Sequence, residues 1–390
     1  MQSGSKPVPA TRAAPETNLG GSARTRGRRH RTWPIAALAA LLAVVVLIVV
    51  LATVHDRSPS PVRLKPVVTG AIDRHAKPSA AAQAAGVTKW VVQLRWRTLQ
   101  PDSPTQALQA GAMGQGGTAD LDAAIRAAGS AASALKIRVY AGTSAPDWAK
   151  RLGGGPIPLG TAGKGSTVGV FWSSDYVRAY ADLVTLLGKR YDDTRQIGEF
   201  VICESGVVYC DGTKQMNKSN AAAYLSHHYT ERADIAAQKA AIDAFARTFT
   251  HTRSSQAFFP FQYVDANGKV GHDYQAMYEV MDYGKKVLGK RWVEENNSAS
   301  DIRESVALYL PLWNRLRVDA AAGWPTEYQT ASLNGIRNLC ATLQWLTVTQ
   351  RAVQVELPVG YDKTGGCPLA GANSIQHWGD QLLTTGAKLV

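Results

Sequence analysis

Short β-branched or aromatic runs alternate with long alanine-rich segments over most of this chain of 390 residues. Each run has the length of a buried strand, and each alanine-rich segment has the apolar spacing of an amphipathic helix. The predicted strands are 67–72, 90–96, 137–141, 197–203, 257–262, 291–295, 326–329 and 353–357. The predicted helices are 119–135, 174–191, 230–249, 274–288, 302–321 and 332–349.

This alternation implies parallel strands joined by right-handed helical crossovers. Eight such strands close into a barrel, so we predict the α/β class and a (β/α)8 TIM barrel over residues 67–390, preceded by a single transmembrane helix. An open doubly wound sheet is the alternative. Against it, no G-x-G-x-x-G turn follows the early strands, and the glycine-rich stretches 111–117 and 153–165 precede no phosphate-binding helix start.

The amino-terminal region carries the signals of a membrane anchor. Residues 1–33 are polar and arginine-rich, which predicts a disordered cytoplasmic tail. Residues 34–54 are all apolar or small, a run of about twenty that suffices to cross roughly 30 Å of hydrocarbon. A cleaved signal peptide is the alternative, but its apolar core is about 7–15 residues long. The positive-inside rule then places the tail in the cytoplasm, and the linker 55–66 and the barrel outside a single-pass cell membrane.

The formal net charge of +13 does not predict a nucleic-acid partner. Seven Lys or Arg residues against the single Glu16 fall within the first 32 residues, where they serve membrane topology. The remaining excess is spread along the chain without a basic run, so no nucleic-acid partner is expected. We predict a monomeric outer domain.

All four cysteines follow the predicted span, and an even count in an oxidising compartment indicates two disulfides. Three connectivities are possible. We favour Cys203–Cys210 with Cys340–Cys367, because each pair closes a local loop beside a predicted strand end. A zinc site is the alternative, but the paired C-x-x-C spacing is missing. We predict neither a metal nor a cofactor.

Three passages resemble the clan A glycoside hydrolases, in particular β-galactosidase-like and cellulase-like barrels. They are Val91–Pro101, with its Trp and Leu-x-Pro turn, Arg138–Trp148, with its Pro-x-Trp, and Phe171–Tyr176. The resemblance implies an acid/base glutamate ending the fourth strand and a nucleophile on the seventh. By our strand count these are Glu204 and Glu327.

Such a pair would cleave a β-linked oligo- or polysaccharide by a retaining mechanism, with carboxyl groups about 5–5.5 Å apart. The alternative for either glutamate is a solvated strand end or a structural partner of an arginine. Cys203 stands where the family usually has an asparagine that binds the sugar. An inactive barrel that binds envelope glycan, or one that assists a membrane polysaccharide machine, is therefore the competing hypothesis.

Further residues are predicted to bind the sugar from strand ends and the loops after them. Aromatic rings stack on sugar rings. Each tryptophan taken singly fits the core better than a sugar platform, but four at one rim favour the platform. Glu356 is the rival of Glu327, and its alternative is a salt bridge with Arg95 or Arg138. The predicted substrate-binding set is Arg95, Trp96, Trp148, Trp172, Gln262, Asn296, Trp324, Gln329, Glu356 and Tyr361.

Overall fold

The computed structural model describes residues 63–160, 166–302, 306–363 and 366–389. The predicted tail and span, and the linker up to residue 62, lie outside the described residues. Within the part described, no helix is both long enough and apolar enough to cross a membrane.

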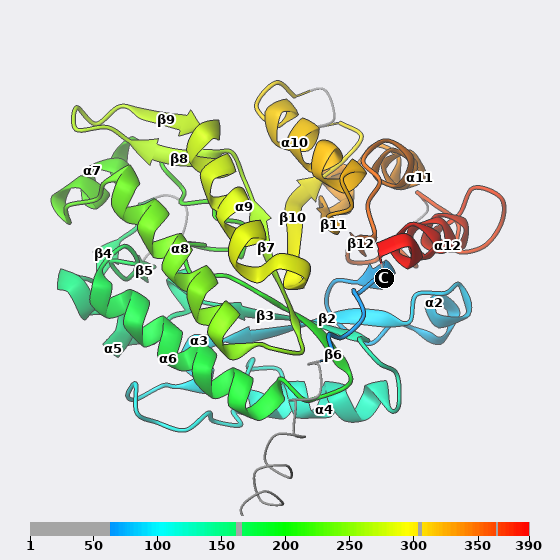
Figure 1. Cartoon of the computed structure of the whole chain (residues 1–390), viewed down its shortest axis with the longest axis horizontal. Coiled ribbons are helices and arrows are strands. Elements are labelled where there is room, and N and C mark those ends of the chain that lie inside the picture. Colours follow the sequence, from blue (N-terminus) through cyan, green and yellow to red (C-terminus); the bar gives the residue numbers. More distant parts are fainter. Residues whose placement is uncertain (1–62, 161–165, 303–305, 364–365, 390) are drawn as a thin grey trace, which may run out of the picture. The chain divides into compact units, whose positions relative to one another are not determined.

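Eight parallel strands form a closed barrel, in the order β1-β2-β3-β6-β7-β10-β11-β12 and back to β1 (Figure 1). The predicted barrel is confirmed. Its strands are β1 (Gly70–Asp73), β2 (Lys89–Arg95), β3 (Leu135–Tyr140), β6 (Ile197–Val201), β7 (Arg253–Phe258), β10 (Trp292–Ala299), β11 (Thr326–Thr330) and β12 (Gln354–Leu357). The strand that precedes Glu204 is the fourth, and the one that contains Glu327 is the seventh.

Helices follow the strands and cover the outside of the barrel. They are α2 (Ala80–Ala84), α3 (Trp96–Leu99), α4 (Thr118–Ala128), α5 (Asp147–Lys150), α6 (Ser174–Tyr191), α7 (Lys218–Ser226), α8 (Glu231–Thr248), α9 (Tyr274–Leu288), α10 (Leu310–Ala321), α11 (Leu339–Gln344) and α12 (Ile375–Gly386). Two small antiparallel pairs project from loops: β4 (Ile157–Pro158) with β5 (Thr167–Val168), and β8 (Phe261–Val264) with β9 (Val270–Asp273).

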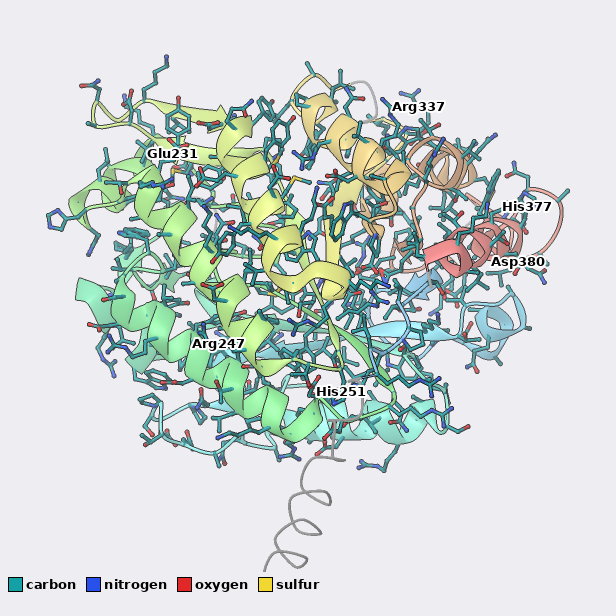
Figure 2. All side chains as sticks on the ribbon, viewed as in Figure 1. Glu231, Arg247, His251, Arg337, His377 and Asp380 are labelled. Atoms are coloured by element: carbon teal, nitrogen blue, oxygen red, sulfur yellow. A yellow bond between two sulfur atoms is a disulfide. The ribbon has the colours of Figure 1, made fainter. Side chains whose placement is uncertain are left out.

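The long helices begin where the sequence supplies amino-terminal caps. Ser173 accepts a hydrogen bond from the backbone of α6, and Thr230 and Asp273 do the same for α8 and α9. Figure 2 shows α8 running from Glu231, near the β8–β9 hairpin, to Arg247 and His251 at its far end.

The apolar core lies between the barrel wall and the helices. Phe200 on β6 stacks on Phe249 after α8, with ring centroids 4.5 Å apart. Gly284 on α9 leaves room for the Trp292 ring, which a Cβ there would approach to 2.4 Å. The inside of the barrel is different, because its middle layers are built from charged side chains.

The fifth strand was predicted wrongly at 257–262. The structure ends β7 at Phe258, and β8 begins at Phe261. The true strand begins with Arg253-Ser-Ser-Gln256, a polar run that does not look like a buried strand. These residues are nonetheless buried, and the Ser255 hydroxyl donates a hydrogen bond to Glu199 inside the barrel.

Candidate functional site at the mouth of the barrel

Six charged side chains fill the middle of the barrel, and we call them the interior cluster: Lys136, Arg138, Glu199, Glu295, Glu327 and Glu356. They come from β3, β6, β10, β11 and β12. The register pairs Lys136 with Glu199, and Glu295 with Glu327, on neighbouring strands. All six side chains are almost completely buried.

Lys136 lies at the centre of the interior cluster. Its Nζ is 2.7 Å from Glu327, 2.9 Å from Glu295, 3.1 Å from Glu356 and 3.3 Å from Glu199. Burial opposes its charge, but the four carboxylates outweigh burial and raise the pKa of Lys136 well above its usual value. The ammonium therefore stays charged and holds the glutamates together.

Arg138 forms the upper side of the interior cluster. Its Nη1 and Nη2 donate to the two carboxylate oxygens of Glu356 at 2.8 and 2.6 Å, and Nη2 also donates to Glu295. Although burial acts the other way, Arg138 and Lys136 lower the pKa of Glu356 to about 2. The salt bridge that we weighed as the alternative for Glu356 is thus present.

Glu327 has the opposite protonation preference. Burial, reinforced by Glu199, raises its pKa well above the ordinary value despite Lys136. Burial likewise raises the pKa of Glu295. The positive charges of Lys136 and Arg138 neutralise the interior cluster if two of its four carboxyl groups stay protonated. Because its pKa is raised, Glu327 is poorly suited to act as an anionic nucleophile.

The interior carboxylates also have metal-ligand spacing. One oxygen each from Glu199, Glu295 and Glu327 lies within 4.8 Å of the others. Lys136 contacts all three, so a cation could bind there only by displacing the ammonium. The donor set therefore fits a buried ion cluster better than a metal centre.

Glu204 lies on the other side of the barrel wall. It follows β6, which ends at Val201, and it lies near Tyr176 and Tyr180 of α6 instead of among the interior glutamates. It is 1% exposed, and neither carboxyl oxygen has a hydrogen-bond partner among the described residues. Burial, aided by Asp234, raises the pKa of Glu204 well above its usual value, and Lys214 only partly offsets this.

The structure therefore does not bring Glu204 and Glu327 together. Glu204 packs near Tyr176 and Tyr180 of α6, whereas Glu327 contacts Lys136 inside the barrel. Neither glutamate lines a pocket at the mouth. Their catalytic role stays a prediction, and this geometry gives it no support.

A polar pocket of about 360 Å³ opens above the interior cluster, at the carboxyl ends of the barrel strands. This end is where β/α barrels carry their sites. We call this cavity the mouth pocket. Its lining includes Arg74, His75, Gln93, Arg138, Tyr140, Tyr209, Asp211, Asn297 and Gln329. Arg138 is its link to the interior cluster.

The loop after β6 is held over the mouth pocket by a disulfide. The predicted bridges Cys203–Cys210 and Cys340–Cys367 are both confirmed. Cys203–Cys210 ties the end of the strand to the segment that carries Tyr209 and Asp211 into the pocket. Gly142, which follows β3, allows this loop to pack closely against it. Its φ is +47°, and a Cβ there would lie 2.2 Å from the Gly206 carbonyl oxygen.

Several polar atoms in the mouth pocket have no partner. Arg74 donates through Nη2 to the carbonyl and hydroxyl oxygens of Thr330, but its Nε is buried without a hydrogen bond among the described residues. The same holds for Arg138 Nε and Asn297 Oδ1. Buried polar atoms normally have partners, so these three atoms are unsatisfied groups in the wall of the mouth pocket.

Most of the predicted sugar-binding residues lie elsewhere. Trp96, Trp148, Trp172 and Trp324 pack in or against the core, which is the alternative that we weighed for each of them. Gln262 accepts a hydrogen bond from the Lys214 backbone. Asn296 donates a hydrogen bond to the Phe258 carbonyl oxygen and accepts one from the Trp313 indole, outside the barrel. Tyr361 is buried after β12. Gln329 lines the mouth pocket, and Arg95 lines a second pocket beside it.

The mouth residues that we did not predict carried a weak signal. Gln93 and Arg138 each interrupt an apolar run, as in Val92-Gln93-Leu94 and Ile137-Arg138-Val139. A polar side chain at an alternate position of a barrel strand points inward, so the pattern marks the interior. Arg74, Tyr209 and Asp211 lie in loops, where periodicity gives no such signal.

The fold defines the chain as a (β/α)8 barrel, and comparisons with known proteins find solved structures of similar fold. No protein-family model and no curated protein matches the sequence. Solved barrels similar to it include the β-amylase catalytic domain of Paenibacillus polymyxa, at 9% identity and TM-score 0.49 over 83% of this chain and 99% of that one.

Two further similar structures come from other bacteria. Endo-glycoceramidase II of Rhodococcus sp. has 12% identity and a TM-score of 0.44, over 83% of this chain and 81% of that one. The endo-β-1,4-mannanase of Thermotoga petrophila has 10% identity and a TM-score of 0.45, over 84% and 77%. At these values the likeness is one of fold alone.

Proposed function

We propose that the barrel binds a saccharide in the mouth pocket, as the outer domain of a membrane-anchored protein. The observation that carries this proposal is the pocket itself, which lies at the functional end of the barrel and combines an exposed tyrosine with unpartnered polar atoms. Its volume of about 360 Å³ is within the ordinary range for small-ligand sites.

The lining has the chemistry that sugar rings require. Tyr209 is 57% exposed and offers an aromatic face for stacking on the C–H side of a ring. Arg74 and Asn297 line the pocket with polar groups, and a small shift of either side chain would present its unsatisfied atom to a sugar hydroxyl or ring oxygen. Gln93 on β2 and Gln329 on β11 add amide groups to the pocket lining.

Cleavage is the second candidate, favoured by the motif resemblance and by the strand count. A two-carboxylate mechanism needs an acid and an ionised carboxylate on either side of the bond. Asp211 is the carboxyl group in the mouth pocket, and burial raises its pKa, as an acid requires. Among the described residues, no second carboxyl group lines this pocket, and Glu356 in the interior cluster is engaged by Arg138. We therefore propose binding without turnover.

The membrane anchor is part of the proposal. It rests on the apolar run 34–54 and on the arginines that precede it. Two disulfides support an oxidising compartment for the barrel, because such bonds persist outside the cytoplasm.

The test measures binding and hydrolysis on the full-length chain in mild detergent, with a panel of β-linked oligosaccharides. Tyr209→Ala should weaken binding about 3–10-fold, the loss expected for one aromatic contact. Tyr209→Phe keeps the ring and is the matched control, which should bind nearly as the natural chain does. Glu204→Gln should leave binding unchanged.

Two results would overturn the proposal. One is the absence of binding to every saccharide in the panel. The other is turnover by the natural chain that disappears in both Glu204→Gln and Glu327→Gln while both variants remain folded, which would restore the glutamate pair as catalytic.

A further inference from the structure

We infer that the ligand is an acidic saccharide, and that it extends from the mouth pocket into a second pocket beside β2. This inference rests on the proposed saccharide function and narrows it to glycans that carry carboxylate or phosphate groups. Three features support it: the unpaired arginine in the mouth, the continuity of the two pockets, and the unequal pairing of their cations and carboxylates.

Arg74 is the first feature. It follows β1, and burial lowers its pKa, with Glu356 only partly offsetting that effect. No carboxylate oxygen of the described residues lies within 4.0 Å of its nitrogens, whereas Arg138 beside it is paired with two glutamates. A guanidinium that is largely desolvated and lacks a counter-ion is a ready partner for an anionic group.

The second feature is a side pocket of about 450 Å³ next to the mouth pocket. Its lining includes His75, Lys77, Gln93, Arg95, Met113 and Asp120. His75 and Gln93 line both pockets, so the two cavities adjoin. Next to this side pocket, β1 pairs with β2 through Ile72 with Lys89 and Asp73 with Trp90.

The third feature is how the charges are paired. Lys77 and Arg95 are exposed, and within the described part of the chain no carboxylate oxygen lies within 4.0 Å of their nitrogens. Asp120, by contrast, accepts hydrogen bonds from the backbone of Gly114 and Gly116 at 2.7 and 2.6 Å. The cations are thus open to a ligand while this carboxylate is already satisfied.

Asp211 and His75 are two further titratable groups that line the mouth pocket, together with Tyr140 and Tyr209. Asp211 accepts a hydrogen bond from Thr213 N at 3.1 Å, and burial raises its pKa, which favours the uncharged form. Burial and Arg74 lower the pKa of His75, which therefore adds little positive charge. The charge that a ligand meets comes mainly from Arg74, Lys77 and Arg95.

Binding is measured by calorimetry on the full-length chain in mild detergent. The ligands are three oligosaccharides of equal length: a uronate oligomer, a phosphorylated oligomer and a neutral one. Each is titrated at about 50 mM and about 300 mM salt, where charge attraction is weakly and strongly screened. Acidic ligands should bind at least about 10-fold more tightly than the neutral one at low salt, and lose most of that advantage at high salt.

Variants of single arginines then identify which cation binds the acidic group of the ligand. Arg74→Gln should weaken acidic binding about 10-fold and change neutral binding less than about 2-fold, as expected when a buried charge-assisted contact is lost. Arg95→Gln, at an exposed position, should cost about 2–3-fold. Arg126→Gln on α4 is the matched control, because Arg126 is exposed but lines neither pocket.

The outcomes distinguish the inference of an acidic ligand from the proposed saccharide binding. If either acidic ligand binds preferentially and the preference falls in Arg74→Gln, the inference holds and the tighter of the two identifies the anionic group. If the neutral oligomer binds as tightly and without salt dependence, the acidic ligand is wrong while the saccharide function stands. If no oligomer binds, both fail. Arg95→Gln and the salt dependence keep the test decisive should Arg74→Gln not fold.

Discussion

The interior cluster and the mouth pocket adjoin within one barrel and share Arg138, yet their charges are arranged in opposite ways. In the interior cluster, Lys136 contacts four glutamate carboxyl groups, and Arg138 forms a bidentate salt bridge with Glu356. At the mouth, Arg74 Nε and Asn297 Oδ1 are buried and have no hydrogen-bond partner in the described part of the chain. Paired charges specify and stabilise the barrel, whereas unpaired ones are available for binding.

This difference also explains why glutamates on barrel strands can mislead. A buried carboxylate on the seventh strand satisfies the positional rule for a nucleophile. The carboxyl group of Glu327 nevertheless contacts Lys136, whose Nζ is 2.7 Å away. Position in the fold therefore has to be read together with the partners of each charge.

Removing Lys136 should give the largest effect. In Lys136→Met, four buried carboxyl groups lose their shared counter-ion, so unfolding should become easier by about 3–5 kcal/mol. Denaturant unfolding at neutral pH measures this change. The control is Lys189→Met on the exposed surface of α6, which should change stability by less than about 0.5 kcal/mol. A Lys136→Met protein as stable as the natural chain would contradict the structural role of the interior cluster.

The two disulfides sharpen the comparison, because one lies at the mouth and the other does not. Cys340 and Cys367 are 27 residues apart, and replacing both by serine should cost about 3–4 kcal/mol of stability. Cys203 and Cys210 are 7 residues apart, and the same change should cost about 2–3 kcal/mol. Saccharide binding should fall in the second double variant alone, because that bridge positions Tyr209 and Asp211.

Thermal melts and binding titrations of the two double variants measure these effects together. Equal loss of binding in both would show that the mouth pocket does not depend on the loop after β6 in particular.

Glu204→Gln should produce a smaller change, of opposite sign. Burial raises the pKa of Glu204 above the ordinary value of 4.5, so the folded chain holds its proton more tightly than the unfolded chain does. The stability contributed by this group is present below about pH 4.5 and is lost as the pH rises through the folded pKa. The neutral glutamine removes that loss, and stability at neutral to alkaline pH should rise by about 1 kcal/mol.

Unfolding midpoints at about pH 5, 7 and 9 test this expectation. The gain should grow with pH. A variant that is destabilised equally at every pH would show that Glu204 is ionised and paired in the folded protein.

The sequence was sufficient to predict the barrel, because seven of the eight predicted strands coincide closely with strands of the structure and long helical segments separate most of them. The fifth strand was misplaced because the buried run Arg253–Gln256 is polar and is stabilised by contacts inside the barrel. The disulfide pairing was also predicted correctly, since each bridge closes a local loop. In these cases local pattern and tertiary structure agree.

The site was much harder to predict. Glu204 lies beyond the end of β6 at Val201, where strand periodicity no longer sets the direction of a side chain, and it lies near α6. The partners of Glu327 and Glu356 lie on β3, about two hundred residues earlier in the chain, and no local pattern reveals them. The mouth pocket is assembled from loops whose positions depend on the closed barrel.

The most direct test of the central claim is a crystal structure of the protein with a bound acidic oligosaccharide. We predict ligand density in the mouth pocket, between the Tyr209 ring and the Arg74 guanidinium, with Lys136 and its four glutamates undisturbed. Density against Glu204 or Glu327, with the mouth pocket empty, would contradict the assignment of function to the unpaired charges at the mouth.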